Sequence, residues 1–252
     1  MKLRVISFNI RCCDDPNGNS IPERAVRLDK VTSAYDADII CFQEMRPAWE
    51  PFIEKYYLSK YAIFNKYRAR EGDVESSPIL WRKDMFDCVK SGYFWLSDTP
   101  DTESRGWDEV YNCYRMCVYV LLKEKGTGKT FVVMNTHFGF GDSGQVKSAK
   151  LIASRAARFA NYPIFITGDF NMQPDTVGYA AMAKNFLDVN AETVNDMRDT
   201  YHAYDPTIHR NQHIDYCFAN GYVTPISQRL MDDTVDGKFP SDHFGLFSVL
   251  EF

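Results

Sequence analysis

Short runs of hydrophobic residues recur along this chain, and stretches with helical spacing separate some of them. Runs rich in Val, Ile, Phe and Tyr, bounded by polar or turn-forming residues, are typical of β-strands. Strands are expected at residues 3–8, 38–42, 77–82, 86–96, 114–122, 130–136, 163–168, 214–218, 222–230 and 243–249. Strands interspersed with helices indicate an α/β or layered α+β domain.

Two helices are predicted from the same pattern. After the first strand, Ser20 can act as an N-cap, Pro22 falls in the first turn, and Glu23 follows the cap by three residues, as in a capping box. A second amphipathic helix is expected at about 144–160. Few helical stretches separate the strands between 77 and 136, which favours antiparallel pairing and therefore mixed sheets.

The composition is that of an ordinary globular protein. The chain has 252 residues, of which 45% are hydrophobic and 25% charged. No Pro/Gly/Ser-rich linker or repeat divides it, so we expect one domain over residues 1–252. The odd count of seven cysteines, with no Cys-x-x-Cys pair, favours buried thiols in a reducing compartment. No membrane-length apolar stretch or leader is recognised, and a cytoplasmic monomer is expected.

The charge balance narrows the choice of substrate. A formal net charge of -5 argues against a surface that grips long nucleic acid, because such binding relies on clustered Lys and Arg. The balance is compatible with a small phosphorylated substrate. Positive residues do cluster at Lys66, Arg68 and Arg70. The simplest interpretation of that run is a solvated face.

Polar residues with catalytic potential fall at the ends of the expected strands. They are Asn9, Glu44, His137, Asp169 and Asn171. Each alone could satisfy a turn, cap a helix or lie in the core. Loops at strand ends deliver side chains to a common cleft, however, and ligand sites in α/β folds gather there. The set as a whole therefore predicts a functional site.

Two further groups lie near the C-terminal end of the sequence. Asp215 sits in the apolar run Ile214-Asp215-Tyr216, and Asp242 precedes His243 in Ser241-Asp242-His243-Phe244. A carboxylate in an apolar strand is costly to bury without a partner, and histidine offers a charge-assisted hydrogen bond. Asp215 and His243 are therefore expected to form a dyad.

These groups match the needs of phosphate-ester hydrolysis. That reaction uses a hard cation on oxygen ligands, a group that deprotonates water, and donors to the phosphoryl oxygens. Glu44, Asp242 and Asn9 can supply the oxygen ligands, and Asp169 can act as the base. The remaining donors would be Asn171, His137 and His243. The five histidines include no His-Glu-x-x-His pattern, so Mg²⁺ or Mn²⁺ is preferred over zinc.

The chain resembles the endonuclease/exonuclease/phosphatase superfamily, the fold typified by deoxyribonuclease I. The motifs that carry the resemblance occur in order along the whole chain: Ser7-Phe8-Asn9-Ile10-Arg11, Phe42-Gln43-Glu44, Asn135-Thr136-His137, Gly168-Asp169-Phe170-Asn171, Ile214-Asp215-Tyr216 and Ser241-Asp242-His243. Segments 77–83, 94–100 and Arg105-Gly106-Trp107-Asp108 are similar to the bacterial phosphatase-like branch. The resemblance implies a four-layer sandwich of two mixed β-sheets flanked by helices.

The resemblance also implies roles for individual residues. Glu44 would be the principal metal ligand, supported by Asn9 and Asp242. Asp169 would position the attacking water with Asn171 beside it, and His243, supported by Asp215, would contact the scissile phosphate. Glu75 matches the family carboxylate that orients the second histidine, His137. Arg115 matches an arginine that faces the same cleft and binds substrate phosphate.

The substrate is not inherited with these motifs. After Asn-Thr-His many relatives continue with an Asp-His pair and a later Arg, whereas this chain has 138–145 as Phe-Gly-Phe-Gly-Asp-Ser-Gly-Gln, and its 66–73 loop lacks the usual Arg-Asp-Asp-Gly. We expect hydrolysis of a small phosphate mono- or diester. One alternative is a DNA or RNA nuclease, in which Trp107 and Tyr111 stack on a base. Another is a non-catalytic binding module of the same fold.

Overall fold

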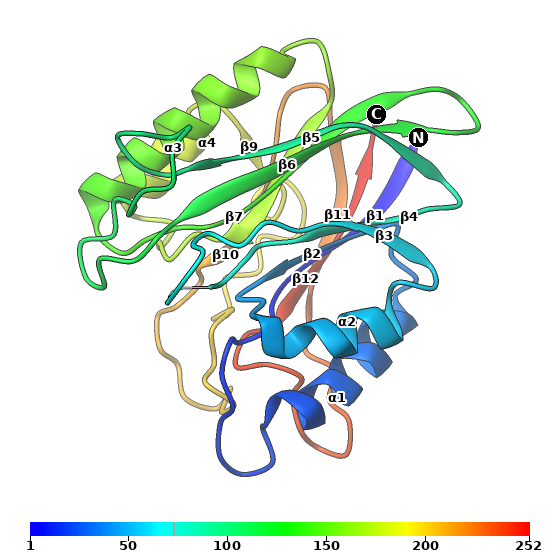
Figure 1. Cartoon of the computed structure of the whole chain (residues 1–252), viewed down its shortest axis with the longest axis vertical. Helices are drawn as coiled ribbons and strands as arrows, with labels where there is room; N and C mark the ends of the chain where they lie inside the picture. Colours follow the sequence, from blue (N-terminus) through cyan, green and yellow to red (C-terminus); the bar gives the residue numbers. More distant parts are fainter. Residues whose placement is uncertain (73) are drawn as a thin grey trace.

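Two β-sheets pack face to face and helices cover their outer faces (Figure 1). The computed structural model describes residues 1–72 and 74–252, so Asp73, at the end of the 66–73 loop, lies outside the described residues. This arrangement confirms the expected four-layer sandwich of two mixed sheets. Both chain termini lie at the same end of the sandwich (Figure 1).

The first sheet contains the N-terminal and C-terminal strands. Its order is β11 (Thr224–Met231), β12 (Gly245–Glu251), β1 (Lys2–Asn9), β2 (Ile39–Gln43), β4 (Ile79–Arg82) and β3 (Tyr61–Phe64). Strands β1 and β2 are parallel, with Asn9 opposite Gln43, and the other neighbours are antiparallel. The last residue of β1 therefore lies beside the residue that precedes Glu44.

The second sheet has the same general plan. Its order is β5 (Phe86–Trp95), β6 (Met116–Glu124), β7 (Thr130–His137), β8 (Ile164–Asp169), β10 (Asp215–Ala219) and β9 (Leu187–Asp188). Strands β7 and β8 are parallel, with His137 opposite Asp169. Strand β10 runs antiparallel to β8 and places Asp215 opposite Asp169. Each sheet thus brings one parallel pair of strand ends to the same edge.

The helices lie on the outer faces of the two sheets. Helices α1 (Ile21–Ala34) and α2 (Glu50–Tyr56) cover the first sheet, and α3 (Asp142–Ala156) and α4 (Val177–Ala183) cover the second (Figure 1). Short 3₁₀ turns, η1 (Pro47–Trp49) and η2 (Ala157–Phe159), precede α2 and follow α3. Helix α1 begins after Ser20, whose backbone N–H donates to the Glu23 carboxylate at 3.1 Å, as the capping-box pattern predicts.

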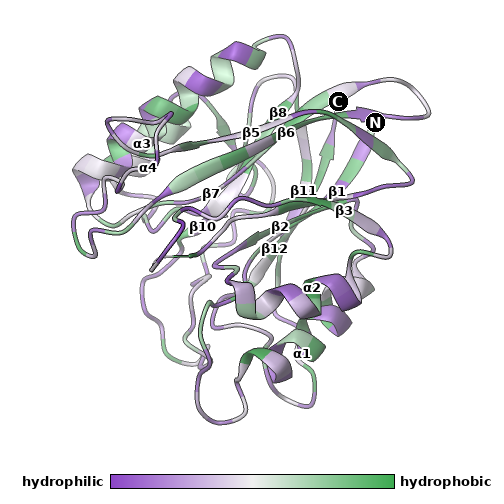
Figure 2. Ribbon diagram, viewed as in Figure 1, coloured by the Kyte–Doolittle hydropathy of each residue, from purple (hydrophilic) through white to green (hydrophobic). Residues whose placement is uncertain are grey.

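Alternation along the strands fills three apolar layers. In β1, Leu3 and Val5 face the opposite sheet, while Ile6 and Phe8 face α1 and α2. Both faces of the strand are therefore buried from Val5 onward, and apolar residues from this stretch enter the layer between the sheets as well as the layer under the helices. Figure 2 shows hydrophobic residues concentrated in the strands of both sheets. The packed sheets hold the strand ends, and the site on them, in fixed relative positions.

Every expected strand is present, with bounds within two residues of those predicted. The short elements β3, β9, α2 and α4 were not predicted, because each spans too few residues to display a clear period. One predicted pairing is wrong: strands 77–82 and 86–96 do not pair, since β4 joins the first sheet and β5 the second. The strong antiparallel pairing of β5, β6 and β7 is as expected.

The cysteines were expected to be buried thiols, and no membrane-spanning stretch was expected. All seven cysteines are free thiols, but Cys88 is exposed and Cys13 and Cys113 are only half-buried. Among the described residues, no helix is both long and apolar enough to span a bilayer.

Candidate active site

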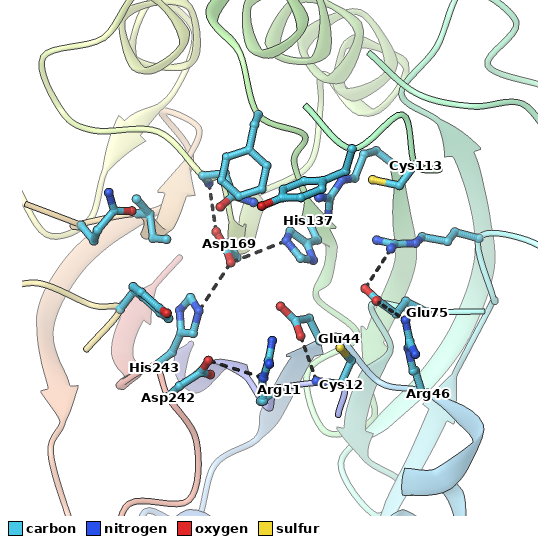
Figure 3. A pocket seen from close by; sticks show the side chains of 18 residues that line it. Arg11, Cys12, Glu44, Arg46, Glu75, Cys113, His137, Asp169, Asp242 and His243 are labelled. Atoms are coloured by element: carbon cyan, nitrogen blue, oxygen red, sulfur yellow. Dashed lines mark hydrogen bonds and ion pairs between the residues drawn. The ribbon is translucent and has the colours of Figure 1, made fainter. Parts of the chain in front are cut away.

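A pocket of about 530 Å³ opens at the edge where the parallel strands of both sheets end (Figure 3). It is lined by residues from loops after β1, β2, β7 and β8 and from the C-terminal segment. Of the predicted site residues, Glu44, Glu75, Arg115, His137, Asp169, Asn171, Asp242 and His243 line it directly. Asn9 and Asp215 lie beneath it, and each bonds to a lining residue.

Asp169 lies at the centre of this group. Its Oδ2 accepts a hydrogen bond from Asn9 Nδ2 at 2.9 Å, and its Oδ1 accepts one from the Asn171 backbone N–H at 2.9 Å. The Nε2 atoms of His137 and His243 lie 3.6 and 3.9 Å from the same Oδ2 (Figure 3). Burial, together with the charge on Asp215, raises the pKa of the Asp169 carboxyl to about 7.

The predicted dyad of Asp215 and His243 is present. His243 Nδ1 donates to Asp215 Oδ2 at 2.8 Å, and both side chains are buried. Burial opposes a charged imidazole, but the carboxylates of Asp215 and Asp169 outweigh it and raise the pKa of His243 to about 10. This imidazole is therefore a cationic donor whose Nε2 faces the pocket.

The predicted contact between Glu75 and His137 is wrong. Glu75 Oε1 accepts from Arg46 Nη2 at 3.1 Å, and Glu75 Oε2 pairs with Arg68 Nη2 at 3.0 Å. No hydrogen-bond partner reaches His137 Nδ1 among the described residues. Guanidinium groups bind a carboxylate more strongly than a neutral imidazole does, so Glu75 pairs with Arg46 and Arg68 rather than with His137. Burial, with the charges on Arg115 and Arg68, holds the pKa of His137 well below its usual range.

The burial of Arg68 differs from the expectation that its basic run is a solvated face. Its run with Lys66 and Arg70 was interpreted as a solvated face, but the Arg68 side chain is only 7% exposed and lines the pocket. The pairing with Glu75 accounts for its burial, because a buried cation requires a nearby anion. Nothing in the spacing of the run distinguishes the buried Arg68 from the half-buried Lys66 and the exposed Arg70.

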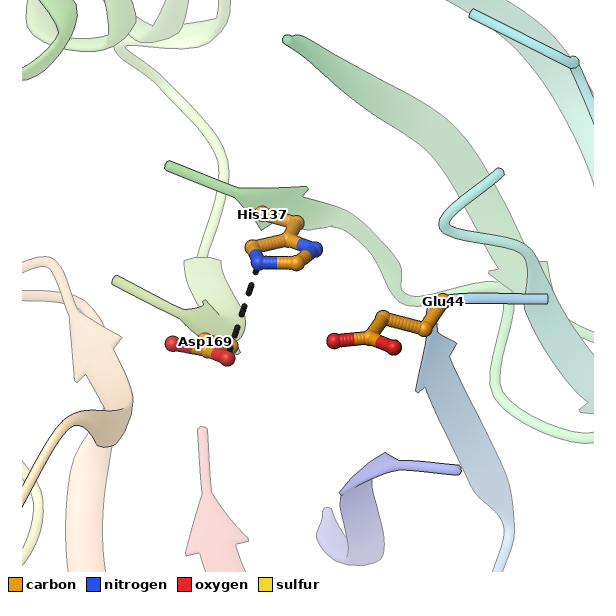
Figure 4. Close-up of side chains that lie close together, drawn as sticks. All are labelled: Glu44, His137 and Asp169. Carbon is orange, nitrogen blue, oxygen red and sulfur yellow. Dashed lines mark ion pairs between the residues drawn. The ribbon is translucent and has the colours of Figure 1, made fainter. Parts of the chain in front are cut away.

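The carboxylates near Glu44 fit a hard divalent cation. Glu44, His137 and Asp169 each place one ligand atom within 4.8 Å of the others (Figure 4). Asp242 lines the same pocket, and burial with repulsion from Glu44 raises its pKa. Buried carboxylates that repel one another in this way are stabilised by a cation with several oxygen ligands.

Asn9 makes a different contact from the one expected of a metal ligand. Its amide nitrogen donates to both Glu44 Oε1, at 3.0 Å, and Asp169 Oδ2. Its amide oxygen accepts the Arg11 backbone N–H at 3.0 Å. The side chain therefore links two carboxylates that would otherwise repel each other, and its oxygen keeps a second lone pair.

Backbone conformation at the site is unusual. Arg11, Glu44 and Asn171 have φ values of 61°, 62° and 48°, in the left-handed region that non-glycine residues seldom adopt. All three follow strand ends that carry site residues. Such strain persists only where surrounding contacts enforce it, and it is concentrated at functional sites.

Several pocket residues had weak or no signal in the sequence. Arg11 lies at the end of a family motif, and Arg46 follows Glu44 by two residues, so proximity to a strand end was the available clue. Phe140 lies three residues after the end of β7 but is apolar and carried no catalytic signal, and Tyr201 lies in a loop that follows no predicted strand end. Tyr201 packs against His243, with ring centroids 5.0 Å apart, and thereby closes one wall of the pocket.

Next to Tyr201, His202 is buried in an aromatic environment. Its ring lies 4.7 Å from Phe239 and 4.2 Å from Phe244, centroid to centroid. Within the described ranges neither ring nitrogen has a hydrogen-bond partner. Burial lowers the pKa of His202 to about 4, so the folded protein holds a neutral imidazole there.

This environment predicts acid sensitivity of the metal-free protein. The unfolded chain binds a proton at His202 below its ordinary pKa of 6.5, and the folded chain does so only below about 4. The stability contributed by the neutral imidazole is therefore present above pH 6.5 and is lost as the pH falls through about 4, by roughly 3 kcal/mol. Urea unfolding in EDTA should show a smaller loss for His202→Phe than for the wild type. Identical pH profiles would contradict this assignment.

Comparison with known proteins agrees with the fold and the site. The model of the Endonuclease/Exonuclease/phosphatase family matches residues 6–243. The chain is similar to the solved mannosyl-6-phosphatase of Bacteroides thetaiotaomicron, with 28% identity, a TM-score of 0.87, and coverage of 99% of this chain and 100% of that one. An endonuclease/exonuclease/phosphatase protein from Bacteroides vulgatus has 26% identity, a TM-score of 0.89, and coverage of 100% and 99%.

A more distant likeness concerns the fold alone. TDP2 from D. rerio, solved with a single-stranded DNA product, has 19% identity, a TM-score of 0.78, and coverage of 100% of this chain and 99% of that chain.

Proposed function

This chain belongs to the endonuclease/exonuclease/phosphatase family, whose members are metal-dependent phosphoester hydrolases, and on this premise we propose that it hydrolyses an ester of a small phosphorylated molecule. The observation that carries the proposal is the convergence of both histidine Nε2 atoms on Asp169 Oδ2, at 3.6 and 3.9 Å. The carboxylate can accept a proton from water, and the two imidazoles beside it can donate hydrogen bonds to phosphoryl oxygens.

The side chains have complementary parts in this reaction. Asp169, held by Asn9 and by the Asn171 backbone, accepts a proton from the attacking water. The water oxygen forms a bond to phosphorus as the bond to the ester oxygen breaks, and the ester oxygen takes a proton from solvent and leaves as the alcohol. His243, charged through its pairing with Asp215, donates from Nε2 to a phosphoryl oxygen as negative charge develops. His137 offers an uncharged donor to the same group.

Glu44 and Asp242 are the residues that would hold a divalent cation, with Mg²⁺ preferred and Mn²⁺ as a substitute. Bound there, the cation would offset negative charge on the phosphoryl oxygens. Asn9 keeps the Glu44 carboxylate in place through its amide nitrogen. Arg115 lines the same pocket and adds positive charge toward the phosphate.

A small substrate is favoured over a polymer, and a sugar phosphate is the first candidate. The pocket is a bounded volume of about 530 Å³, and the chain carries a net charge of -5, which disfavours extended contacts to a nucleic-acid backbone. The related B. thetaiotaomicron protein, with 28% identity over nearly the whole chain, is a mannosyl-6-phosphatase. We extend that substrate class, but not the particular sugar, to this chain.

A substrate panel tests the proposal. Mannose 6-phosphate, glucose 6-phosphate, glycerol 1-phosphate, a bis-aryl phosphodiester and a short single-stranded DNA are supplied with Mg²⁺ or with EDTA, and released product is measured. We expect Mg²⁺-dependent release from at least one sugar phosphate. Cleavage of the DNA alone, with rates that fall steeply as salt rises, would indicate the nuclease instead. No turnover of any compound would favour the non-catalytic module.

Glu44→Gln provides an independent test of the metal assignment. Loss of this anionic ligand should weaken Mg²⁺ binding by roughly 100-fold or more, since losing even a group that only orients a ligand costs about 10- to 100-fold. Calorimetric Mg²⁺ titration and the Mg²⁺ dependence of turnover measure the effect. Glu54→Gln, an exposed change on α2, is the matched control. Wild-type Mg²⁺ affinity in Glu44→Gln would sink the assignment.

A further inference from the structure

One end of the pocket is separate from the catalytic group. Figure 3 shows Glu75 and Arg46 on the far side of Glu44 and His137 from Asp169 and His243. Resting on the proposed function, we propose that this end, together with Tyr111 and Phe140, is a leaving-group subsite that binds the ring of a sugar phosphate. The subsite would select among phosphate esters, and of its residues only Arg115 would also contact the phosphate.

The aromatic part of this subsite is unusually exposed. Tyr111 lines the pocket, and its side chain is 66% exposed despite its apolar ring. Phe140, from the loop after β7, packs edge-on against it, with ring centroids 5.4 Å apart. An aromatic face at a pocket entrance binds the apolar C–H face of a sugar ring. The edge-on contact with Phe140 favours this orientation of the Tyr111 ring.

The polar part offers both donors and acceptors. Arg46 pairs with Glu75 at 3.1 Å while its own side chain remains 36% exposed, so the guanidinium can also bind a hydroxyl. Glu75 is only 9% exposed, but it lines the pocket and its carboxylate oxygens keep further lone pairs for a hydroxyl donor. Arg115 is buried, and its Nη1 finds no acceptor in the part of the chain that the structure describes. A buried donor without an acceptor is costly unless a ligand or water completes it.

The charge balance favours hydroxyl groups over a second phosphate. Arg46, Arg68 and Arg115 stand near Glu75 and Asp108, which offset most of their charge. A second phosphate would meet Glu75 as well as the arginines. A neutral hydroxyl can donate a hydrogen bond to the Glu75 carboxylate and accept one from an arginine guanidinium.

Asp108 fixes the two parts of the subsite relative to each other. Its Oδ1 accepts the backbone N–H groups of Val110 and Tyr111, at 3.0 and 2.8 Å. Its Oδ2 accepts from Arg115 Nε at 3.1 Å and Nη2 at 3.0 Å. One buried carboxylate therefore positions both the exposed tyrosine and the buried arginine. This gives a structural reason for the Asp of the Arg105-Gly106-Trp107-Asp108 motif.

The rim of the subsite is formed by the 107–111 loop and by the 138–145 segment, which runs from the loop after β7 into the first turn of α3, and these two segments approach each other closely. A Cβ on Gly139 would lie 2.8 Å from Asp108 Cα, and a Cβ on Gly144 would lie 1.8 Å from the Trp107 carbonyl oxygen. The Glu109 backbone N–H donates to the Phe140 carbonyl at 2.9 Å. These glycines belong to the 138–145 segment, where the chain departs from its relatives. Binding therefore needs little ordering of the rim, which favours affinity.

The test compares a ring substrate with a ringless one. For Tyr111→Ala, we expect kcat/KM for the best sugar phosphate of the panel to fall about 10-fold, mainly through KM, since one aromatic contact is worth about 1 kcal/mol or slightly more. The value for glycerol 1-phosphate should change less than twofold. Tyr111→Phe keeps the ring and should retain sugar-phosphate activity. Tyr222→Ala, an exposed tyrosine outside the pocket, is the matched control.

The outcomes separate the subsite from the proposed function. Equal effects of Tyr111→Ala on both substrates, or no effect on either, would overturn the subsite and leave the hydrolase intact. Wild-type hydrolysis of glycerol 1-phosphate but of no sugar phosphate would also overturn it. Hydrolysis of no phosphate ester at all would overturn the proposed function and the subsite together.

Discussion

Asp169→Asn is expected to lower kcat by a factor of about 10² or more while leaving the fold intact. Asparagine has nearly the same shape and can still accept the Asn171 backbone N–H at Oδ1. It cannot accept a proton from water, and it replaces the oxygen on which His137 and His243 converge with an amide group. The loss should therefore fall on the chemical step rather than on substrate binding.

Steady-state kinetics and thermal unfolding test this together. The loss should appear in kcat with little change in KM, and the melting temperature should stay at or above that of the wild type. Asp188→Asn is the matched control, because Asp188 is also a buried carboxylate but bonds to Tyr179 and the Asn190 backbone outside the pocket. Unchanged kcat in Asp169→Asn would exclude a role as base.

His243→Gln is expected to lower kcat by a similar factor, about 10² or more, because it removes the cationic donor to the developing phosphoryl charge. Asp215→Asn should cost less, on the order of 10-fold, since the imidazole remains but loses the partner that keeps it charged and oriented. A large loss of kcat in His243→Gln together with a smaller loss in Asp215→Asn would indicate that the two residues act as a dyad.

A second histidine–aspartate pair supplies the control for this series. His209 Nδ1 lies 2.9 Å from Asp199 Oδ2, is 75% exposed, and does not line the pocket. His209→Gln should leave turnover unchanged. If Asp215→Asn were as inactive as His243→Gln and also unfolded at lower temperature, the dyad would be structural rather than catalytic.

Much of the architecture could be predicted because its signals are local. Apolar runs set the strands within two residues of their observed bounds, and the cap at Ser20 set the start of α1. Elements of only a few residues, such as β3 and β9, carry too little of a period to be recognised. Sheet membership is not local, which is why the pairing of 77–82 with 86–96 was predicted wrongly.

Some contacts of the candidate site could be predicted from the sequence, and others depended on the tertiary structure. The dyad of Asp215 and His243 was predictable because a buried carboxylate needs a partner and few histidines were available. The partner of Glu75 was not predictable, because Arg46 and Arg68 reach it from two separate loops. The contacts of Asn9 depended likewise on the positions of Glu44 and Asp169, which lie on different sheets.

The sequence by itself determined the strands, the capped helix and which polar residues stand at strand ends, since these follow from spacing within one segment. It also determined the family, through motifs that occur in order along the chain. Only the tertiary structure decided which of those polar groups touch: Asp169 as the centre, Asn9 as a donor, Glu75 between two arginines and Tyr111 at the rim. The physical reason is that such contacts form across two packed sheets and their loops, where charge, burial and geometry compete between residues far apart in the chain.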